Sequence, residues 1–326
     1  MQLSRINSLV ELFFSKYKEI NSVADKPFLK WLKENEKNFF TWEQVALKIQ
    51  ILSEYLRTNL ADGDRCILLS ENRPEWLISD ISIMNAGGVT VPLFTTYSEK
   101  DYEYIINDCK PKICIVSNEI QLKKIEKFIS DEIKVISIES LNERVENVEN
   151  IFNEHSIKNK PNPYISFNQN IERKDLACII YTSGTTGNPK GVTLSHNNIV
   201  SNVDDLKSVF NDLKSEMTSL NILPWAHIYG LTTELYYNML NNNKIAISSG
   251  PEKFVKEIGE IQPDMLYLVP RVLQMIKKKI EKLDKPFIRC ILPFILRKIF
   301  GGNLLTIFIG GSQLDASTKI FIMNII

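Results

Sequence analysis

Short apolar runs alternate with longer segments of helical periodicity, and this pattern constrains the fold of the chain more than any other feature. The first helical segment begins with a capping-box pattern, Thr41 followed by Gln44, and its apolar residues recur every three or four positions as far as Leu60. We expect strands at 66–69, 89–93 and 112–116, with helices starting near Pro74 and Ser98. Strands that alternate with helices of this length predict parallel βαβ units.

The alternation resumes after a weakly patterned stretch at 119–163, where we expect a peripheral helix and strand followed by a surface connection. Further strands are expected at 175–181, 220–223, 244–247, 265–269 and 304–309, with helices starting at Ser195 and Arg271. The predicted fold class is α/β, with two layered subdomains whose mainly parallel sheets are flanked by helices. We place the approximate subdomains at 1–170 and 171–326.

Composition excludes several classes of protein. Lysine plus arginine equals aspartate plus glutamate, 39 against 39, so no net field favours nucleic acid. The five cysteines form no C-x-x-C pair and predict reduced thiols in the cytoplasm. There is no secretory pattern at the N-terminus and no apolar run of the roughly 18 residues needed to cross a bilayer. A basic and apolar segment at 286–300 is interpreted as a core-facing helix, with peripheral membrane contact as the alternative.

The stretch 181–191 concentrates three glycines, four hydroxyl side chains and one lysine directly after an expected buried strand. Glycines allow successive N–H groups to point at one anion, while hydroxyls and a lysine add further donors and charge. The pattern predicts a phosphate-binding loop. A solvated linker is the simpler alternative, but a linker has no reason to follow a buried strand. The P-loop of nucleotide hydrolases does not fit, because Asn188 and Pro189 separate Gly187 from Lys190.

The spacing Thr-Ser-Gly-Thr-Thr-Gly-x-Pro-Lys-Gly in this loop closely resembles the signature of the adenylate-forming superfamily. That superfamily includes acyl-CoA synthetases, firefly-type luciferases and the adenylation domains of peptide synthetases. Four other segments look like the first part of AMP-forming long-chain acyl-CoA synthetases: 69–76, 86–96, 223–230 and 268–271. The resemblance covers nearly the whole chain and is loosest across 119–170 and 283–300.

The resemblance implies the following site residues. The ATP phosphates would be bound by Thr182, Ser183, Gly184, Thr185, Thr186, Gly187 and Lys190, with Lys190 catalytic and Thr182 also a magnesium ligand. The adenine would pack on the turn Gly310, Gly311 and Ser312, for which an ordinary strand-to-helix turn is the alternative. The acyl pocket would include Trp225, His227, Tyr229 and Gly230.

The chain has three histidines, at positions 155, 196 and 227. The resemblance places His227 near the reacting carboxylate, where it would orient the substrate or stabilise charge. A packed, hydrogen-bonded wall residue is the alternative for His227. We expect His196 at the start of the helix after the loop, and His155 in the polar connection.

The reaction implied by the resemblance joins a fatty acid to ATP, releases pyrophosphate and then passes the acyl group to coenzyme A. ATP, Mg²⁺ and coenzyme A are the expected cofactors and co-substrates. Motifs that follow the adenine turn in the family, and its C-terminal domain, have no counterpart here, so we expect an incomplete chain that is inactive alone. An apolar edge is then expected around Ile307, Phe308, Ile320 and Ile322. An aryl- or amino-acid-adenylating ligase and a non-catalytic nucleotide-binding remnant remain as alternatives.

Overall fold

The computed structural model describes residues 3–20, 25–32, 39–141, 145–158, 167–182, 187–281 and 302–323. Contacts group the chain into two compact units, each assembled from separate segments. The first contains Met1–Lys26, Phe40–Val209 and Pro224–Ile228, and the second contains Pro27–Phe39, Phe210–Leu223 and Tyr229–Ile326. The approximate subdomain boundary near residue 170 falls inside the first unit, because the strand that follows it pairs with the first sheet.

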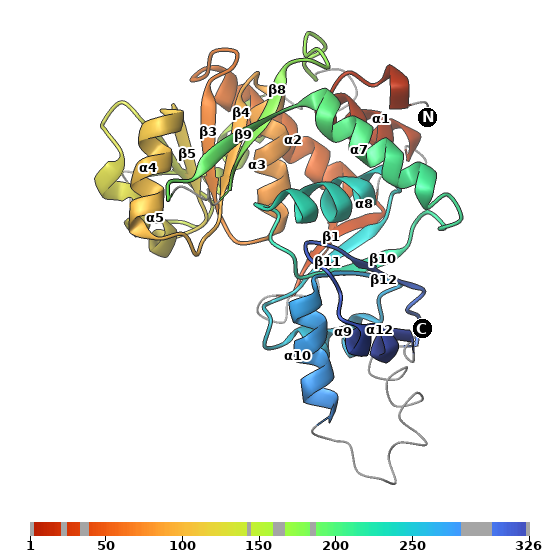
Figure 1. The fold of residues 1–326 in the computed structure, drawn as a ribbon. Coiled ribbons are helices and arrows are strands. Elements are labelled where there is room, and N and C mark those ends of the chain that lie inside the picture. The colour runs from red at the N-terminus through yellow and green to blue at the C-terminus, as the bar shows by residue number, and fades with distance from the viewer. Residues whose placement is uncertain are drawn as a thin grey trace. The chain divides into compact units, whose positions relative to one another are not determined.

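The first unit is built on a seven-stranded sheet with the order β7-β6-β5-β3-β4-β8-β9 (Figure 1). In that order the strands are Glu146–Asn147, Lys134–Ser137, Ile113–Val116, Arg65–Leu69, Val89–Leu93, Leu176–Thr182 and Lys190–Ser195. All neighbouring pairs are parallel except the last, in which β9 runs antiparallel to β8. The predicted parallel sheet is therefore confirmed, and it carries one antiparallel edge strand.

Helices cover both faces of this sheet (Figure 1). They are α1 (Leu9–Glu19), α2 (Trp42–Arg57), α3 (Pro74–Asn85), α4 (Glu99–Cys109), α5 (Glu119–Ile125), α6 (Val148–Lys158) and α7 (His196–Val209), with short 3₁₀ turns η1 (Leu3–Arg5) and η4 (Glu126–Phe128). The capping box of Thr41 and Gln44 opens α2 as predicted. Every residue of α3 is buried, and Ser82 of α3 donates to the carbonyl of Ile49 in α2 at 3.1 Å. On the opposite face, α4 and α5 pack on the apolar side chains of β3, β4 and β5.

The second unit contains a six-stranded sheet with the order β13-β12-β10-β11-β1-β2. In that order the strands are Thr306–Ile309, Met265–Leu268, Thr218–Asn221, Lys244–Ile247, Pro27–Trp31 and Phe39–Thr41. Its helices are the π-helix η5 (Gly230–Tyr236), α8 (Tyr237–Leu240), α9 (Phe254–Ile261), α10 (Pro270–Glu281) and α12 (Ala316–Met323). Phe254 and Ile258 of α9 pack against Leu220 and Leu266 in one apolar core.

Several elements differ from the sequence-based prediction. Strands β1, β2, β7 and β9 were not predicted. β2 and β7 are only three and two residues long, β9 is an exposed edge strand with few apolar residues, and β1 pairs with β11, which is distant in the sequence. His155 lies within α6 and not in a surface connection. The expected apolar edge is only partly exposed: Phe308 is buried against Tyr267, with ring centroids 4.6 Å apart, whereas Ile320 is 63% exposed.

Two of the predictions concern the C-terminal part of the chain and contact with a membrane. The side chain of Ile322 and all of the basic and apolar segment 286–300 lie outside the described residues. Among the helices that the structure describes, none has the length and apolar character required to span a membrane.

Candidate active site

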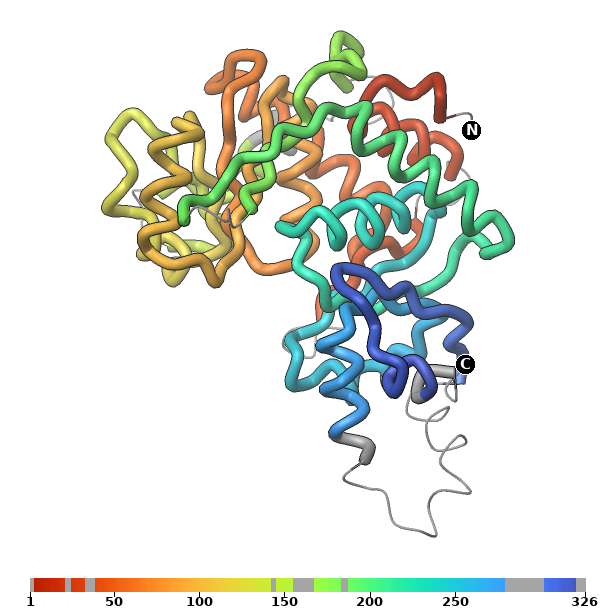
Figure 2. The backbone as a smooth tube through the Cα atoms, in the orientation of Figure 1, coloured from red at the N-terminus to blue at the C-terminus, as the bar shows by residue number. Residues whose placement is uncertain are grey.

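The loop predicted to bind phosphate connects two paired strands. β8 ends at Thr182, β9 begins at Lys190, and these two residues are directly opposite each other in the antiparallel register. Figure 2 shows the two strands running side by side along the backbone trace. Side chains of directly opposite residues share one face of a sheet, with β-carbons about 5 Å apart. The structure therefore places Thr182 and Lys190 side by side at the mouth of the loop, with their side chains on one face of the sheet.

The central part of the loop cannot be placed, since Ser183, Gly184, Thr185 and Thr186 lie outside the described residues. Gly187, where the description resumes, has φ of +102°, a conformation that favours glycine. A β-carbon at this position would meet no atom of the described residues within 4 Å, its chain neighbours aside.

Lys190 is exposed, and its ammonium makes no hydrogen bond or ion pair with the rest of the described chain. Thr182 is exposed as well. A lysine without an internal salt bridge is available to an anion, because no ion pair has to break when the anion binds.

The end of β8 is held in place by two phenols. The hydroxyl of Tyr181 donates to Oδ2 of Asp108 at 2.5 Å, and the hydroxyl of Tyr97 donates to the carbonyl oxygen of Tyr181 at 2.8 Å. A β-carbon on Gly191 would lie 3.1 Å from Cζ of Tyr181, so glycine lets the tyrosine ring pass close to β9. These contacts fix the strand end from which Thr182 projects.

His227 belongs to the segment 224–228, which lies in the first unit. Trp225 anchors the segment: its ring is fully buried in an edge-to-face contact with Trp76 at 5.7 Å, and its backbone N–H donates to Oδ1 of Asn72 at 3.0 Å. The backbone N–H of His227 closes a turn onto the carbonyl of Pro224 at 3.1 Å. Trp225 thus supports the segment from the protein interior, while His227 is exposed.

A chain of contacts joins His227 to the end of β8, where the loop predicted to bind phosphate begins. The ring of His227 lies 6.1 Å from that of Phe94, and Phe94 makes an edge-to-face contact with Tyr97 at 5.2 Å. Tyr97 in turn bonds to Tyr181 at the end of β8. Although His227 is exposed as a residue, its surroundings shield part of the imidazole from water and lower its pKa, which favours the neutral ring. Phe94 and Tyr97 follow the carboxyl end of β4 and Tyr181 lies at the carboxyl end of β8, the end of the strands at which ligands bind in open α/β sheets.

In the second unit, two predicted elements contact each other. A β-carbon on Gly310 would lie 2.5 Å from Cζ of Tyr229, so the tyrosine ring packs directly across the glycine backbone. Gly311 has φ of +82°, and Ser312 is exposed. Gly230 is buried as the first residue of η5. Burial raises the pKa of Tyr229 to about 12, so its hydroxyl stays protonated and able to donate a hydrogen bond at neutral pH.

Sequence reasoning predicted roles for His227, Thr182 and Lys190 but gave none to the residues that lie between His227 and the end of β8. Phe94, Tyr97 and Asp108 received no role, although two aromatic residues directly after a strand are a signal that could have been noticed. A second missed feature is the pairing of Thr182 with Lys190, which requires knowledge of β9.

The oxygen atoms near the loop determine whether Mg²⁺ could bind there. Among the described residues, no group of three or more His, Cys, Asp or Glu side chains could hold a metal ion. Mg²⁺ is commonly held by one or two protein oxygens, substrate phosphates and water. The hydroxyl of Thr182 therefore fits as one ligand of an ion that is bound mainly through the phosphates of a nucleotide.

Comparison with known families decides the assignment. The model of the family described as "AMP-binding enzyme" matches residues 18–326. The chain belongs to this family. A relative from Dictyostelium discoideum, fatty acyl-CoA synthetase A, is 29% identical over 284 residues, which are 80% of this AMP-binding chain and 41% of the relative. The chain thus spans less than half the length of that relative.

Solved structures agree with the fold of this AMP-binding chain. A red-emitting luciferase from Phrixothrix hirtus is 21% identical, with a TM-score of 0.81, and the match covers 98% of this chain and 58% of the luciferase. VinN, solved in complex with L-aspartate, is 18% identical, with a TM-score of 0.77, and the match covers 98% of this chain and 74% of VinN. At these identities the likeness concerns the fold of adenylate-forming enzymes.

Proposed function

We propose that this chain supplies the ATP-binding and carboxylate-activating part of an AMP-forming long-chain fatty acid–CoA ligase. In the proposed reaction, a fatty acid carboxylate attacks the α-phosphate of ATP, pyrophosphate leaves, and the acyl group of the resulting adenylate then passes to the thiol of coenzyme A. The observation that carries the proposal is the placement of Thr182 directly opposite Lys190 at the mouth of a glycine-rich loop.

Charge stabilisation is the main task of the loop in this proposal. Nucleotidyl transfer places negative charge on the departing pyrophosphate, and preorganised donors stabilise it at no further cost in reorganisation. Lys190 offers a cation and Thr182 a hydroxyl. A Mg²⁺ ion bound to the phosphates would neutralise further charge, with Thr182 as its protein ligand. The role of Ser183, Gly184, Thr185 and Thr186 as phosphate donors is part of the same proposal.

His227 has an orienting role in the proposal. A fatty acid is already ionised at neutral pH, so its carboxylate needs no general base before it attacks phosphorus. A neutral imidazole with a lowered pKa can instead donate one hydrogen bond to a carboxylate oxygen and hold it for in-line attack. The contact with Phe94 limits the directions in which the ring can turn.

Support for a fatty acid as substrate comes from two sources. The Dictyostelium relative is named a fatty acyl-CoA synthetase. In addition, the surroundings of His227 are aromatic and apolar, with Phe94 and Tyr97 on the path to the loop. Since the VinN complex resembles this chain only in fold, its bound L-aspartate does not favour an amino acid as substrate here.

The proposal is tested with stable analogues of the adenylate, in which a sulfamoyl group replaces the phosphate. Palmitoyl-, anthraniloyl- and aspartyl-sulfamoyl adenosine are titrated into the chain by calorimetry. We expect the palmitoyl analogue to bind at least about tenfold more tightly than the others, a difference of about 1.4 kcal/mol. Equal or tighter binding of the anthraniloyl or aspartyl analogue would favour the corresponding ligase, and no binding of any analogue would contradict the assignment as a whole.

A further inference from the structure

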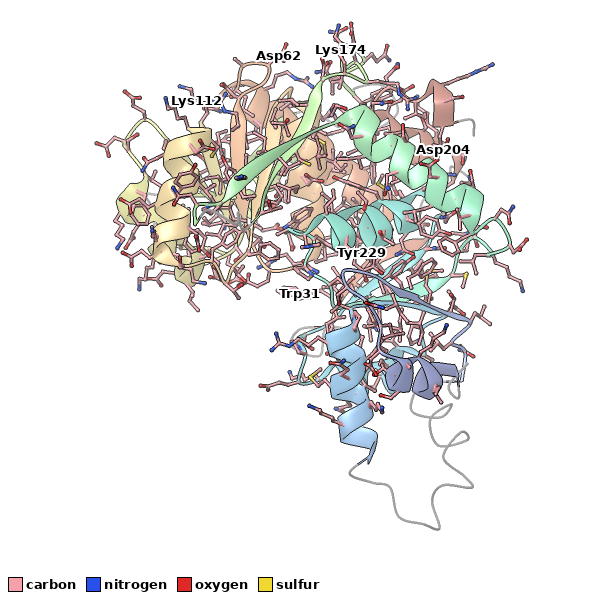
Figure 3. The ribbon with its side chains drawn as sticks, viewed as in Figure 1. Trp31, Asp62, Lys112, Lys174, Asp204 and Tyr229 are labelled. Carbon is pink, nitrogen blue, oxygen red and sulfur yellow. The ribbon has the colours of Figure 1, made fainter. Side chains whose placement is uncertain are left out.

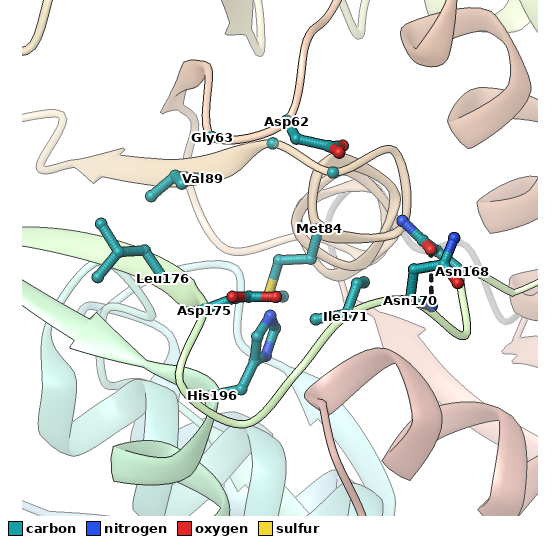
Figure 4. A pocket seen from close by; sticks show the side chains of 12 residues that line it. Asp62, Gly63, Met84, Val89, Asn168, Asn170, Ile171, Asp175, Leu176 and His196 are labelled. Carbon is teal, nitrogen blue, oxygen red and sulfur yellow. Dashed lines mark hydrogen bonds between the residues drawn. The ribbon is translucent and has the colours of Figure 1, made fainter.

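A pocket lies at the amino ends of the parallel strands of the first sheet, opposite the ends that carry the proposed active site. It has a volume of about 380 Å³ and is lined by residues at the amino ends of β3, β4 and β8 and at the start of α7. Figure 3 shows Asp62 and Lys174, which precede β3 and β8, on the same side of this unit, and Figure 4 shows the pocket from close by. β8 has seven residues and separates this edge from the phosphate loop by about 20 Å. The pocket is therefore distinct from the proposed active site.

His196 is the decisive residue of this pocket. Its side chain is only 2% exposed, and Nδ1 accepts a hydrogen bond from the backbone N–H of Leu9 at 3.2 Å. Burial lowers the pKa of the imidazole to about 4, partly offset by the nearby carboxylate of Asp175, so the ring is neutral at pH 7. Because Nδ1 is an acceptor, the single proton of the neutral ring is on Nε2.

The Nε2–H group of His196 points to a ligand. It has no hydrogen-bond partner among the described residues, and Figure 4 shows the ring directed into the pocket, toward Asp175 and Met84. Although the residue is 2% exposed, Nε2 is not among the fully buried polar atoms, so this N–H group faces the space of the pocket and can donate to a ligand oxygen there. The first requirement for a ligand is thus a hydroxyl or carbonyl oxygen.

The second requirement comes from charge. Two carboxylates line the pocket, those of Asp62 and Asp175, together with the amides of Asn168 and Asn170, and no lysine or arginine is among the lining residues. Oδ2 of Asp175 accepts the backbone N–H of Glu172 at 2.8 Å. Within the described chain the carboxylate of Asp62 makes no hydrogen bond or ion pair, and it lies so close to Gly87 that a β-carbon on Gly87 would be 2.2 Å from its Oδ1. The pocket thus favours a cation.

The remaining wall is apolar. Met84, Val89, Ile171 and Leu176 contribute hydrocarbon side chains, of which Ile171 is buried and Leu176 is 42% exposed. A ligand that satisfies all three properties combines a positive charge, an oxygen acceptor and a short hydrocarbon body.

We propose that this pocket binds a small amino alcohol or a chemically similar organic cation. The ammonium lies between Asp62 and Asp175, the oxygen accepts the Nε2–H of His196, and the hydrocarbon part packs on Met84 and Leu176. This site is independent of nucleotide binding and does not depend on the proposed ligase function.

The test uses leucinol as the probe and the 326-residue chain as the protein. Binding is measured by saturation-transfer NMR and calorimetry. Two matched compounds separate the requirements: 4-methylpentan-1-ol lacks the amine, and leucine carries a carboxylate in place of the CH₂OH group of leucinol. We expect saturable binding of leucinol, binding of both matched compounds weaker by at least about tenfold, and no change in leucinol affinity when ATP is saturating.

Three variants complete the experiment. Asp62→Asn removes one carboxylate and should weaken leucinol binding about tenfold, whereas Asp131→Asn makes the same change at an exposed position outside the pocket and should have no effect. Leu176→Trp should fill the pocket and abolish binding. Thermal melts establish that each variant is folded. The proposal is overturned if leucinol does not bind below about 5 mM, if it binds no better than the alcohol, if ATP displaces it, or if the two aspartate variants behave alike.

Discussion

Replacing Glu234 with glutamine should flatten the dependence of the chain's stability on pH. Glu234 is fully buried in the π-helix η5, where an amide N–H of Asn221 donates to Oε2 and Oε1 has no partner within the described structure. Burial raises the pKa of this carboxyl well above its usual value, and the bond from Asn221 offsets only part of that effect. The folded chain therefore keeps a proton that the unfolded chain releases at mildly acidic pH.

The magnitude follows from linkage between protonation and folding. The carboxyl of Glu234 has a higher pKa in the folded chain than in the unfolded chain, where it is about 4.3. Its contribution to stability is therefore complete below about pH 4.3 and is lost as the pH rises toward the pKa of the folded chain. Within that window the free energy of unfolding falls by about 1.4 kcal/mol per pH unit. Glutamine has no proton to release, so the free energy of unfolding of the variant should not fall in this way. Relative to wild type it should rise by about 1.4 kcal/mol between pH 5 and pH 6.

Urea unfolding followed by circular dichroism at pH 5.0, 5.5, 6.0 and 6.5 measures the effect. Glu252→Gln is the matched control, because Glu252 is exposed and the same chemical change there should leave the slope unaltered. The unsatisfied amide of the glutamine costs about 1–3 kcal/mol at every pH, so the slope, and not the absolute stability, is the readout. Parallel curves for Glu234→Gln and wild type would show that the buried carboxyl is ionised and would refute the reasoning.

Two further predictions concern packing and capping. Gly310→Ala should destabilise the chain by about 1–3 kcal/mol in thermal melts, since the new methyl group would overlap the ring of Tyr229. The control Ser312→Ala, in the same turn, should stay within about 0.5 kcal/mol of wild type. Equal melting temperatures for the two variants would contradict the contact between Gly310 and Tyr229. Thr41→Ala removes the capping box of α2 and should cost about 0.5–2 kcal/mol in urea unfolding, whereas Thr58→Ala at the other end of the helix should cost less.

The parts of the fold that were predictable from the sequence are those with strong local signals. β4, for example, is an apolar run buried at every position, and α2 has both a capping box and a regular apolar face. β9 has no such signal: it is a six-residue edge strand whose exposed positions include Val192, and only its pairing with β8 makes it a strand. Short edge strands are decided by tertiary contacts, which no local pattern reports.

Some features of the candidate site were also predictable from local sequence, whereas others depend on the fold. The composition of the loop predicts an anion site, and the structure then shows Lys190 opposite Thr182. The aromatic path from His227 through Phe94 and Tyr97 depends on residues more than 80 positions apart in the chain, and sequence reasoning has no means of pairing them. His196 was correctly expected at a helix start, but its bond to the N–H of Leu9 and its place in a pocket arise only from the fold.

The most direct test of the central claim is the affinity of the chain for ATP, measured by calorimetry with and without Mg²⁺. An exposed ammonium beside a phosphate contributes about 1–2 kcal/mol, so Lys190→Ala should weaken ATP binding roughly 5- to 30-fold without lowering the melting temperature. Lys112→Ala removes an exposed lysine at the amino edge of the same sheet and should leave the affinity unchanged. Unchanged ATP affinity in Lys190→Ala, or equal losses in both variants, would contradict a phosphate-binding role for the loop between β8 and β9.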